Sequence, residues 1–570
     1  MTRHRLLPLL PPLAALLVYG QSLGNGFVLW DDHELITENP IVRSLSRSAV
    51  RAAFTSYDPE LYVPLTTLTF QAEHALFGFR PFFFHLTNLV LHGVASLLVF
   101  LVLRMLLSAG RRPAPDGHRK PASGSEGTVE IAALLCALLF AVHPLNAEAV
   151  AWASARKDVL SGALALVSLF LYLRFREGGS RAAFRGSFAA LLLSLLAKPT
   201  AMVLPFVFLL LHWREGTSPK GKALKEALPF FFLSSVFLAI GFFGKAENIQ
   251  SLTLLQTALL SAKSTVLSTS LFLFPRFSLL FLQATPVALR SAEFFLPLFL
   301  LLAVTVAVRW SLRRTRDVAF GLGIAALFLL PSFANFSKAG AVYVTSDRYM
   351  YLAQVGFLFL LGILLMRLLH SSRTVRGITA AAVSTVLIIA GWGAWRRSLL
   401  WHDSETLFTA ALARNPASAE LRNNMGILRE EDGDLEGARG RYEDALRVRP
   451  SFAPALYGLG KLAQATGDGE RALALYREAT EADPRFLAAY NALGSLLQDR
   501  GNLDGAIAAF RGALEVKPNF AQTRINLADA YGKKGMYREG LQEYMRVMEF
   551  NPEFREEILR KVPQIEDVNL

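Results

Sequence analysis

The chain has 570 residues, enough for two or three domains, and 53% of them are hydrophobic. With a mean hydropathy of +0.35, this composition is typical of a membrane protein with many spans. The formal net charge of +13 would suit a nucleic-acid-binding protein, but the Lys and Arg residues lie in short segments between apolar runs, which argues against that class. The single cysteine, Cys136, excludes an internal disulfide framework.

Apolar runs long enough to cross about 30 Å of hydrocarbon recur through the N-terminal part of the chain. Residues 6–23 resemble a signal peptide, but no small-residue cleavage site follows them, so we predict a retained helix. The two short runs beside Lys198–Pro199 fit either one kinked helix or a tight hairpin. Residues 253–284 are interrupted by charges and a proline, and we expect them to associate with the membrane on its outer side. The predicted spans lie near 6–23, 83–107, 130–147, 157–174, 186–198, 200–213, 228–244, 295–310, 317–335, 349–367 and 376–394.

Basic residues gather between alternate spans, which is the positive-inside signal of cytoplasmic turns. With the N-terminus inside, about eleven crossings put every basic cluster inside and everything after Trp395 outside. Short cytoplasmic turns favour a bacterial inner membrane with the C-terminal part in the periplasm. The alternative is an endoplasmic reticulum membrane with that part in the lumen. The basic clusters are Arg3 and Arg5; Arg111, Arg112, Arg119 and Lys120; Arg174, Arg176, Arg181 and Arg185; Lys220, Lys222 and Lys225; Arg309–Arg316; and Arg373 with Arg376.

A repeat of 34 residues begins after the last predicted span. Small, aromatic and terminal-proline positions at this period are the tetratricopeptide signature, with two helices per repeat. The small residues let the paired helices approach closely, and the aromatic residues fill the space between stacked repeats. Four complete repeats span 419–552, and a half repeat precedes them, whose first helix would be supplied by the final span. The repeating positions are Pro416, Pro450, Pro484, Pro518 and Pro552; Gly426, Gly460 and Gly494; Tyr442, Tyr476, Phe510 and Tyr544; with Phe408 and Ala411 in the half repeat.

The whole chain is therefore predicted to be all-α, with a polytopic membrane-helix domain followed by an α-solenoid. We predict an integral membrane domain at 1–398 and a half repeat or connection at 399–418. The four tetratricopeptide repeats occupy 419–554, and a C-terminal tail follows at 555–570.

Four polar clusters interrupt the apolar part, and the predicted topology puts all four at the outer face. A transporter would tend to place charges in mid-span, whereas these lie at span ends on one side, as an enzyme at a membrane face needs. Gly-rich phosphate loops, CxxC pairs and HExxH are absent from the sequence, so we expect no cofactor, and the need for a divalent metal stays open. The clusters are Asp31–Glu34; Tyr62–Leu65 with His85, Asn88 and His92; His143–Glu148 with Trp152, Arg156, Lys157 and Asp158; and Ser346–Tyr349, with Lys198 on a separate helix end.

These residue types suit glycosyl transfer from a lipid phosphate. An acceptor hydroxyl needs a carboxylate to take its proton, which contributes typically about 10²–10⁴-fold. The departing phosphate needs fixed positive charge, for which Arg is well suited, and the lipid tail needs a groove between spans. The alternatives are structural: a helix-end salt-bridge cluster at Arg156–Asp158, packing roles for His85 and His92, and a helix end at His143.

The order of these motifs along the chain resembles the transmembrane and tetratricopeptide-repeat-containing O-mannosyltransferases, in the wider GT-C class of glycosyltransferases. The resemblance covers nearly the whole chain. It implies a polyprenyl- or dolichyl-phosphate sugar donor, with mannose as the expected sugar, an active site at the outer face and inversion at the sugar carbon. The motifs that carry it are Trp30-Asp31-Asp32, Tyr62-Val63-Pro64-Leu65, Phe84-His85-Leu86-Thr87-Asn88, and Phe140 through Arg156 with its His-Pro pair.

Carried over by this resemblance, Asp31 or Asp32 would be the catalytic base, and Asp32 is slightly favoured. The donor phosphate would be bound by cations at other outer span ends, with polar neighbours completing the donor site. The predicted donor-binding residues are Arg156, Lys198, Arg348, His143, Glu148 and His85.

Asparagines recur on the first helices of the repeats, where a protein acceptor would bind. A carboxamide both donates and accepts, so spaced asparagines can pair with an extended peptide whatever its side chains. The alternative is a chance pattern, because the second repeat has Tyr457–Gly458 at these positions. The predicted acceptor-binding residues are Asn423, Asn424, Asn491 and Asn526.

The rival hypothesis is a non-enzymatic, membrane-anchored scaffold whose repeats assemble a periplasmic or polysaccharide-export complex. Such a scaffold needs the repeats but has no use for acidic and basic residues gathered at one face of the spans. A third hypothesis, a flippase or ligase for lipid-linked sugars, shares the lipid groove. The sequence leaves the sugar and the acceptor protein undetermined.

Overall fold

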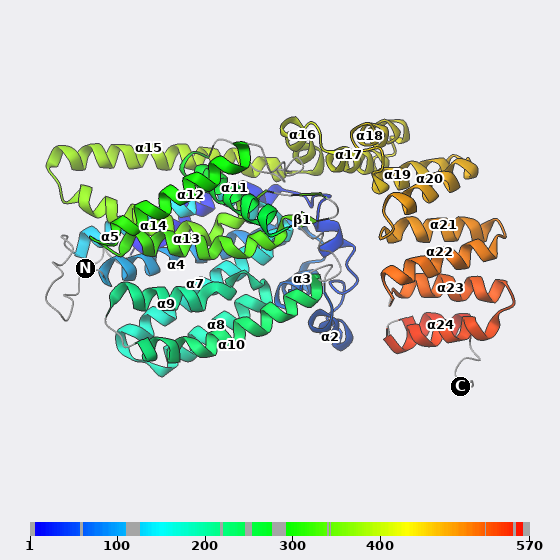
Figure 1. Ribbon diagram of the computed structural model, residues 1–570, viewed down its shortest axis with the longest axis horizontal. Helices are drawn as coiled ribbons and strands as arrows, with labels where there is room; N and C mark the ends of the chain where they lie inside the picture. Colours follow the sequence, from blue (N-terminus) through cyan, green and yellow to red (C-terminus); the bar gives the residue numbers. More distant parts are fainter. Residues whose placement is uncertain are drawn as a thin grey trace. The chain divides into compact units, whose positions relative to one another are not determined.

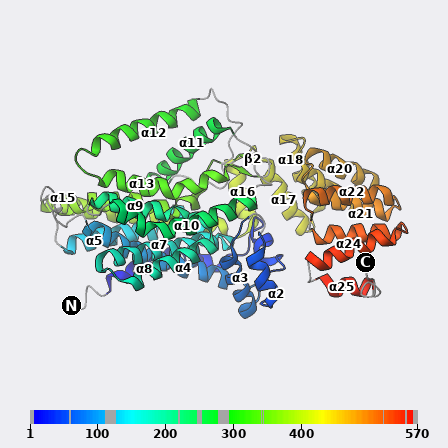
Figure 2. The same cartoon turned by 60° about the horizontal axis from the view of Figure 1, so that its bottom comes forward.

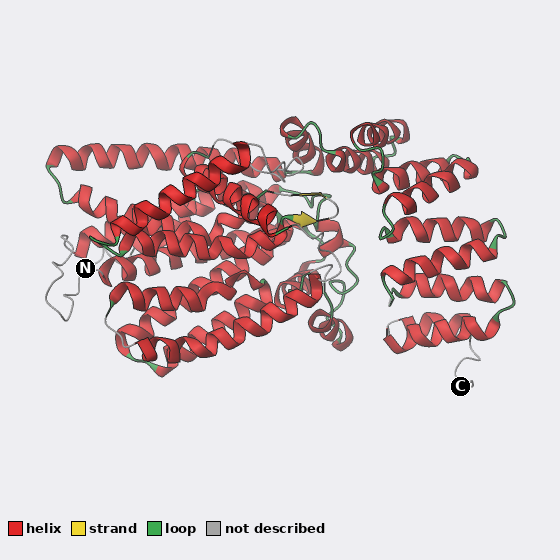
Figure 3. Ribbon diagram, in the orientation of Figure 1, coloured by secondary structure: helices red, strands yellow, loops and turns green. Residues whose placement is uncertain are grey.

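A computed structural model of the chain describes residues 6–57, 61–109, 126–216, 220–245, 253–275, 292–338, 341–342, 344–518, 520–550 and 554–562. The described chain divides into two compact units, Met1–Leu407 and Phe408–Leu570 (Figure 1). Apart from a two-residue antiparallel pair, β1 (Ser337–Lys338) and β2 (Ala341–Val342), its regular structure is helical (Figure 3). The all-α prediction is confirmed. Some positions used in the sequence analysis lie outside the described ranges. They are the basic residues at 3, 5 and 111–120, residues 276–284 and Pro552.

The first unit contains fifteen described helices, most of them long and apolar, and short 3₁₀ turns lie beside several of them. Its helices are α1 (Leu10–Tyr19), α2 (Arg47–Thr55), α3 (Pro64–Phe77), α4 (Pro81–Ala109), α5 (Glu126–Ala141), α6 (Ala147–Ala151), α7 (Arg156–Gly178), α8 (Arg181–Ala197), α9 (Leu204–Glu215), α10 (Lys220–Lys245), α11 (Leu254–Leu273), α12 (Ala292–Ser311), α13 (Asp317–Leu329), α14 (Met350–Leu369) and α15 (Arg373–Ser398).

Among the described residues, eight helices are long and apolar enough to cross a membrane, or up to nine if the bent pair α5–α6 counts as one span. The predicted count of about eleven is therefore not confirmed. The difference arises around Lys198, which has extended backbone angles (φ −165°, ψ 132°) and separates α8, of 17 residues, from α9, of only 12. Since a span needs about 20 residues, neither helix meets the length criterion by itself.

Small residues let the helices of the first unit approach one another closely. Helix α7 packs against both α4 and α8 (Figure 2). Between α7 and α8, the hydroxyl of Ser161 lies 3.0 Å from that of Ser194, and a second serine pair lies farther along. At Gly162, an added Cβ would lie 2.8 Å from the ring of Tyr351 on α14. Close packing without bulky side chains is how helices associate in lipid, and here it brings the ends of α6, α7, α8 and α14 together.

The second unit contains four helix pairs that follow one another along the chain (Figure 1). A glycine with positive φ, such as Gly467 (φ 84°), joins the two helices of each pair. Helix α16 (Ser404–Arg414) precedes the pairs, and the boundary between the two units lies within it. The predicted boundary at 398/399 thus stays a prediction. The helices are α17 (Ala419–Glu431) with α18 (Leu435–Val448), α19 (Ala453–Ala465) with α20 (Gly469–Ala482), α21 (Leu487–Asp499) with α22 (Leu503–Val516), α23 (Ala521–Lys533) with α24 (Tyr537–Phe550), and a final α25 (Arg555–Lys561).

Glycine and aromatic positions of the repeat face each other across each of the first three pairs. A Cβ added at Gly460 would lie 2.5 Å from the ring of Tyr476, which is fully buried. We therefore expect Gly460→Val to lower the free energy of unfolding of the repeats by about 1–3 kcal/mol, since the ring has no room to move. Thermal unfolding of the full chain checks this. The matched control is Gly440→Ala in α18, where no atom lies within 4 Å of the added Cβ and a gain of about 0.5–1 kcal/mol is expected. Equal effects of the two substitutions would contradict the close approach.

Candidate functional site

Three of the four polar clusters meet at one end of the first unit. Asp31 lies in the turn before a single π-helical turn, His33–Thr37, and Glu148 lies on α6. The other members of the site, Lys157, Asp158, Lys198 and Arg348, lie in the first turn of α7, at the C-cap of α8 and in the 3₁₀ turn before α14. These six residues are called the charge cluster below.

Opposite charges alternate through the charge cluster. The Lys157 Nζ lies 3.6 Å from the Asp31 Oδ2, and the Lys198 Nζ donates to the Asp158 Oδ1 at 2.5 Å. The Arg348 Nε lies 3.8 Å from the other oxygen of Asp158, while its Nη1 donates to Glu148. The side chain of Asp31 is 20% exposed, and those of its five neighbours range from 1% to 11%. Asp31 is thus the member with most access to solvent.

Two aromatic rings hold the cations of the charge cluster. The Arg348 guanidinium lies 5.1 Å and the Lys157 ammonium 5.7 Å from the ring centre of Trp152, which is 1% exposed. Tyr349 lies 5.3 Å from Arg348 and 6.0 Å from the Lys198 ammonium. A ring face attracts a cation without neutralising it, so these contacts orient the positive groups and leave their charge available.

Asp32 is fully buried, and both of its oxygens accept hydrogen bonds from the chain itself. The Oδ2 accepts from the Val28 N–H at 2.9 Å, and the Oδ1 accepts from the Ser154 N–H at 2.9 Å and the Ser154 hydroxyl at 2.5 Å. Asp32 therefore ties the loop before it to the turn that begins α7. Burial raises the pKa of Asp32 to about 6, and it outweighs the hydrogen bonds, which lower it.

The raised pKa of Asp32 makes the free energy of unfolding depend on pH. The folded protein holds the Asp32 proton up to about pH 6, whereas the unfolded chain releases it near pH 3.9, so the folded state binds more protons in between. The stability that Asp32 contributes is fully present below about pH 4 and falls as the pH rises to about 6, by on the order of 3 kcal/mol. We expect the difference in melting temperature between the wild type and Asp32→Asn to narrow over that range and to stay constant above it. A difference that is constant from pH 4 to pH 7 would contradict the shift.

Arg156 directly precedes Lys157 at the start of α7, but it is fully buried and its own ion pair and hydrogen bonds are made outside the charge cluster. Its Nη1 pairs with Glu73 at 3.0 Å and donates to Thr69, its Nε donates to Asn88 at 2.5 Å, and its Nη2 donates to the Phe84 carbonyl at 2.7 Å. These contacts join α3, α4 and α7. The sequence analysis kept a helix-end salt-bridge cluster at Arg156–Asp158 as the alternative, whereas the ion-pair partner of Arg156 is Glu73 on α3. The donor-binding role of Arg156 stays a prediction.

The histidines of the predicted site also bind groups of the chain. The His85 Nε2 lies 3.3 Å from the Gly26 carbonyl. His143 accepts a hydrogen bond from the Leu145 N–H through its Nδ1 and stacks on Phe272 at 5.0 Å, so it caps the turn at Pro144. His85 and His143 therefore support the loops around the charge cluster and are not among its members.

Sequence reasoning missed Glu73 as a partner of Arg156 and did not select Lys157 and Asp158 from the third cluster as site residues. A signal for Glu73 was present, because it is the one carboxylate in the apolar helix α3. Its pairing with a residue 83 positions later has no local signature. Among the residues that the structure describes, no group of three or more His, Cys, Asp or Glu side chains could hold a metal ion.

The asparagines predicted to bind an acceptor lie on α17, α21 and α23 of the second unit. Asn423 is 5% exposed, and the Asn491 Oδ1 already accepts from the Thr523 hydroxyl at 2.8 Å. The Asn526 Oδ1 accepts from Gln522 on its own helix, at 3.1 Å. Asn424 is half-buried. These contacts occupy the side-chain oxygens of Asn491 and Asn526, and acceptor binding by the four asparagines stays a prediction.

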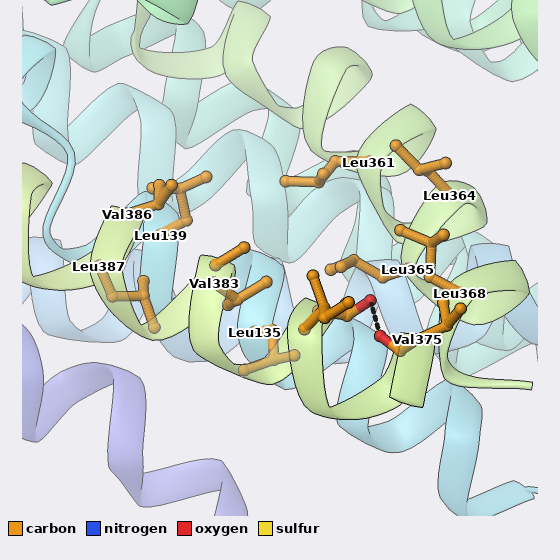
Figure 4. A pocket seen from close by; sticks show the side chains of 13 residues that line it. Leu135, Leu139, Leu361, Leu364, Leu365, Leu368, Val375, Val383, Val386 and Leu387 are labelled. Carbon is orange, nitrogen blue, oxygen red and sulfur yellow. Dashed lines mark hydrogen bonds between the residues drawn. The ribbon is translucent and has the colours of Figure 1, made fainter. Parts of the chain in front are cut away.

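An apolar groove of about 400 Å³ lies between α5, α14 and α15 (Figure 4). Its one polar side chain, Thr379, donates to the Val375 carbonyl of its own helix. The lining residues of α14 follow Arg348 by about 20 Å or more along the helix, so the groove holds no reacting group. It suits a hydrocarbon chain. The lining residues are Leu135, Leu139, Leu361, Leu364, Leu365, Leu368, Val375, Ile378, Thr379, Ala382, Val383, Val386 and Leu387.

A tetratricopeptide-repeat family profile matches residues 390–454, 423–485, 457–522 and 491–548. The predicted repeats are confirmed. Among solved structures, YrrB, a tetratricopeptide-repeat protein with an unusual peptide-binding site, is 26% identical over 25% of this chain and 75% of its own (TM-score 0.24). MamA is 21% identical over 26% of this chain and 87% of its own (TM-score 0.24).

Relatives that match about two thirds or more of the chain are named protein O-mannosyl-transferases. Tmtc3 of Drosophila melanogaster is 26% identical over 68% of this chain and 48% of its own length. Human TMTC4 is 25% identical over 75% of this chain and 66% of its own length, and human TMTC3 is 24% identical over 68% and 45%. The chain spans about half to two thirds of the length of these relatives.

Proposed function

We propose, from its homology to protein O-mannosyl-transferases over most of its length, that the chain is an integral membrane glycosyltransferase. It would transfer a monosaccharide, mannose, from a polyprenyl- or dolichyl-phosphate donor to a hydroxyl group of a protein outside the cytoplasm. The observation that carries this proposal is a partly exposed carboxylate, Asp31, beside Lys157, in a cluster whose other two cations, Lys198 and Arg348, also lie against aromatic rings at the span ends.

Asp31 is our candidate for the base. Asp32 is fully buried, whereas the Asp31 side chain is 20% exposed and its carboxylate lies 3.6 Å from the Lys157 ammonium. In the proposed reaction, Asp31 takes the proton from the acceptor hydroxyl while the oxygen of that hydroxyl bonds to the sugar C1. The bond between C1 and the phosphate oxygen breaks, and the lipid phosphate leaves with that electron pair.

Arg348, Lys198 and Lys157 are our candidates for stabilising the departing phosphate. Arg348 and Lys198 share Asp158, and Glu148 orients Arg348 through its side chain and its backbone N–H. Each cation is therefore fixed in place before substrate arrives, which lowers the reorganisation needed as charge develops on the phosphate. Arg156 is left out of this site because its donors bind Glu73, Asn88, Thr69 and Phe84.

Arg348→Lys tests the phosphate site while keeping the charge and the pairing with Glu148. We expect the KM for the donor to rise about 10-fold or more, because a point charge does not replace a planar fork of donors. Donor kinetics in detergent or nanodiscs measure this. The control is Arg396→Lys, an exposed arginine on α15 that stacks on Trp392. A KM unchanged in both variants would contradict the assignment.

The repeats are proposed to bind the protein acceptor, with Asn424, Asn491 and Asn526 as contacts. Alanine at all three should weaken transfer to long or folded acceptors and leave transfer to a short peptide at high concentration nearly unchanged, because the short peptide needs no delivery. Equal loss on both acceptors would indicate a folding defect.

Incubation of the purified protein with radiolabelled polyprenyl-phosphate mannose and extracytoplasmic protein extract tests the activity itself. Label transferred to protein hydroxyls, released by base-catalysed β-elimination, supports the proposal. Polyprenyl-phosphate glucose and N-acetylglucosamine serve as competing donors. Absence of transfer from every donor, with the protein folded, would favour the scaffold hypothesis.

A further inference from the structure

The segment that leads from the last membrane helix into the repeats packs against the loop that carries Asp31. This segment, residues 395–404, comprises the end of α15, a 3₁₀ turn (Leu399–Trp401) and the first residue of α16, and is called the connector below. It belongs wholly to the first unit. The proposed transfer reaction uses none of its residues.

Hydrogen bonds join the connector to the residues just before Asp31. The Gly26 N–H donates to the His402 carbonyl at 2.9 Å, and the Leu29 N–H donates to the Ser404 hydroxyl at 2.8 Å. Farther back, the Gln21 side chain donates to the Trp395 carbonyl at 2.6 Å and to the Ser398 hydroxyl at 2.7 Å. With Asp32 bound to Ser154 on the other side, the loop is held from two directions, and Asp31 lies between the two attachments.

A second contact reaches the cations. Trp401 stacks on Trp152, with ring centres 5.1 Å apart and planes 17° apart, and both side chains are 1% exposed. Trp152 is the ring that holds Arg348 and Lys157. One turn earlier, Arg397 pairs with Asp347, the neighbour of Arg348, at 3.0 Å. The connector thus supports both the carboxylate and the cations of the charge cluster.

We propose that the connector is part of the active site, with Ser404 and Trp401 as positioning residues: Ser404 for the Asp31 loop and Trp401 for the cations on Trp152. The expected changes in kcat and KM rest on the proposed function. The support that the connector gives to the Asp31 loop and to the cations rests on the contacts alone. The segment that enters the repeats therefore also completes the site, so the connector and the charge cluster cannot be exchanged independently among related enzymes.

The two residues should have separable effects. Ser404→Ala leaves the Leu29 N–H without its acceptor, so the loop relaxes and kcat falls about 3- to 10-fold while the donor KM is unchanged. Trp401→Leu removes the ring behind Trp152, so the donor KM rises by a similar factor. Trp401→Phe keeps a stacked ring and should restore most of the donor affinity.

Amide hydrogen exchange on the full-length protein tests the structural part without any assay of transfer. Ser404→Ala should raise exchange at residues 26–32 and Trp401→Leu at the turn around Trp152, while the control Trp395→Leu, at a 42% exposed tryptophan of α15, should raise neither. Unchanged exchange at both places would overturn the inference, as would a uniform rise across the first unit. If wild-type protein transfers no sugar, the proposed function fails, and the exchange result still decides whether the connector holds the loop.

Discussion

Asp31→Asn should lower the turnover number by about 10²–10⁴-fold while the protein stays folded and binds its donor with nearly unchanged affinity. The substitution keeps the shape of the side chain and removes the group that takes the proton. Asp31 is 20% exposed, so an amide at this place remains hydrated. Lys157, whose side chain is 8% exposed, loses its ion-pair partner but keeps its contact with the Trp152 ring, so we expect a loss of stability without unfolding.

Turnover and donor binding, measured side by side in nanodiscs, check this expectation. Glu34→Gln is the control, because Glu34 is an exposed carboxylate three residues later. Asp32→Asn should behave differently, because one of the two acceptor oxygens becomes an NH2 donor. That donor would face either the Val28 N–H or the Ser154 donors, so we expect the fraction of folded protein to fall while the folded molecules keep their turnover number. Full activity of Asp31→Asn with a large kinetic loss in folded Asp32→Asn would reverse the assignment.

Arg156→Met should destabilise the first unit by about 3–5 kcal/mol, because it leaves the Glu73 carboxylate buried without its cation. The side chain of Glu73 is 10% exposed and that of Arg156 is 0%, so water cannot replace the lost partner. The double variant Arg156→Met/Glu73→Leu removes both charges and should recover a large part of the loss, since burying an ion pair is often no better than burying two apolar side chains.

Unfolding midpoints in detergent, with Arg80→Met as the exposed-arginine control, measure this pair. The same variants distinguish the two roles considered for Arg156. A structural role predicts that the folded fraction of the double variant binds donor normally. Lost donor affinity in that folded fraction would restore Arg156 as a phosphate ligand.

The repeats could be predicted from the sequence because their interactions are local. Gly460 and Tyr476 are 16 positions apart in one helix pair, and a glycine–aromatic pair recurs at the next step of 34 residues as Gly494 and Phe510. The convergence of three polar clusters also followed from the sequence, because residues at alternate span ends reach the same side of a membrane. The span count did not follow as surely, since hydropathy left open whether the two short runs beside Lys198 form one span, two spans or neither.

The sequence by itself therefore determined the architecture of this chain and the end of the membrane unit where its charges gather. Only the tertiary structure decided which charge pairs with which. Asp31 and Asp32 are neighbours with the same chemistry, yet the fold turns one towards Lys157 and buries the other against Val28 and Ser154. The choice depends on where α7 begins relative to the first loop, more than 120 residues away in sequence. Such contacts are set by the packing of whole helices, which no local pattern of residues records.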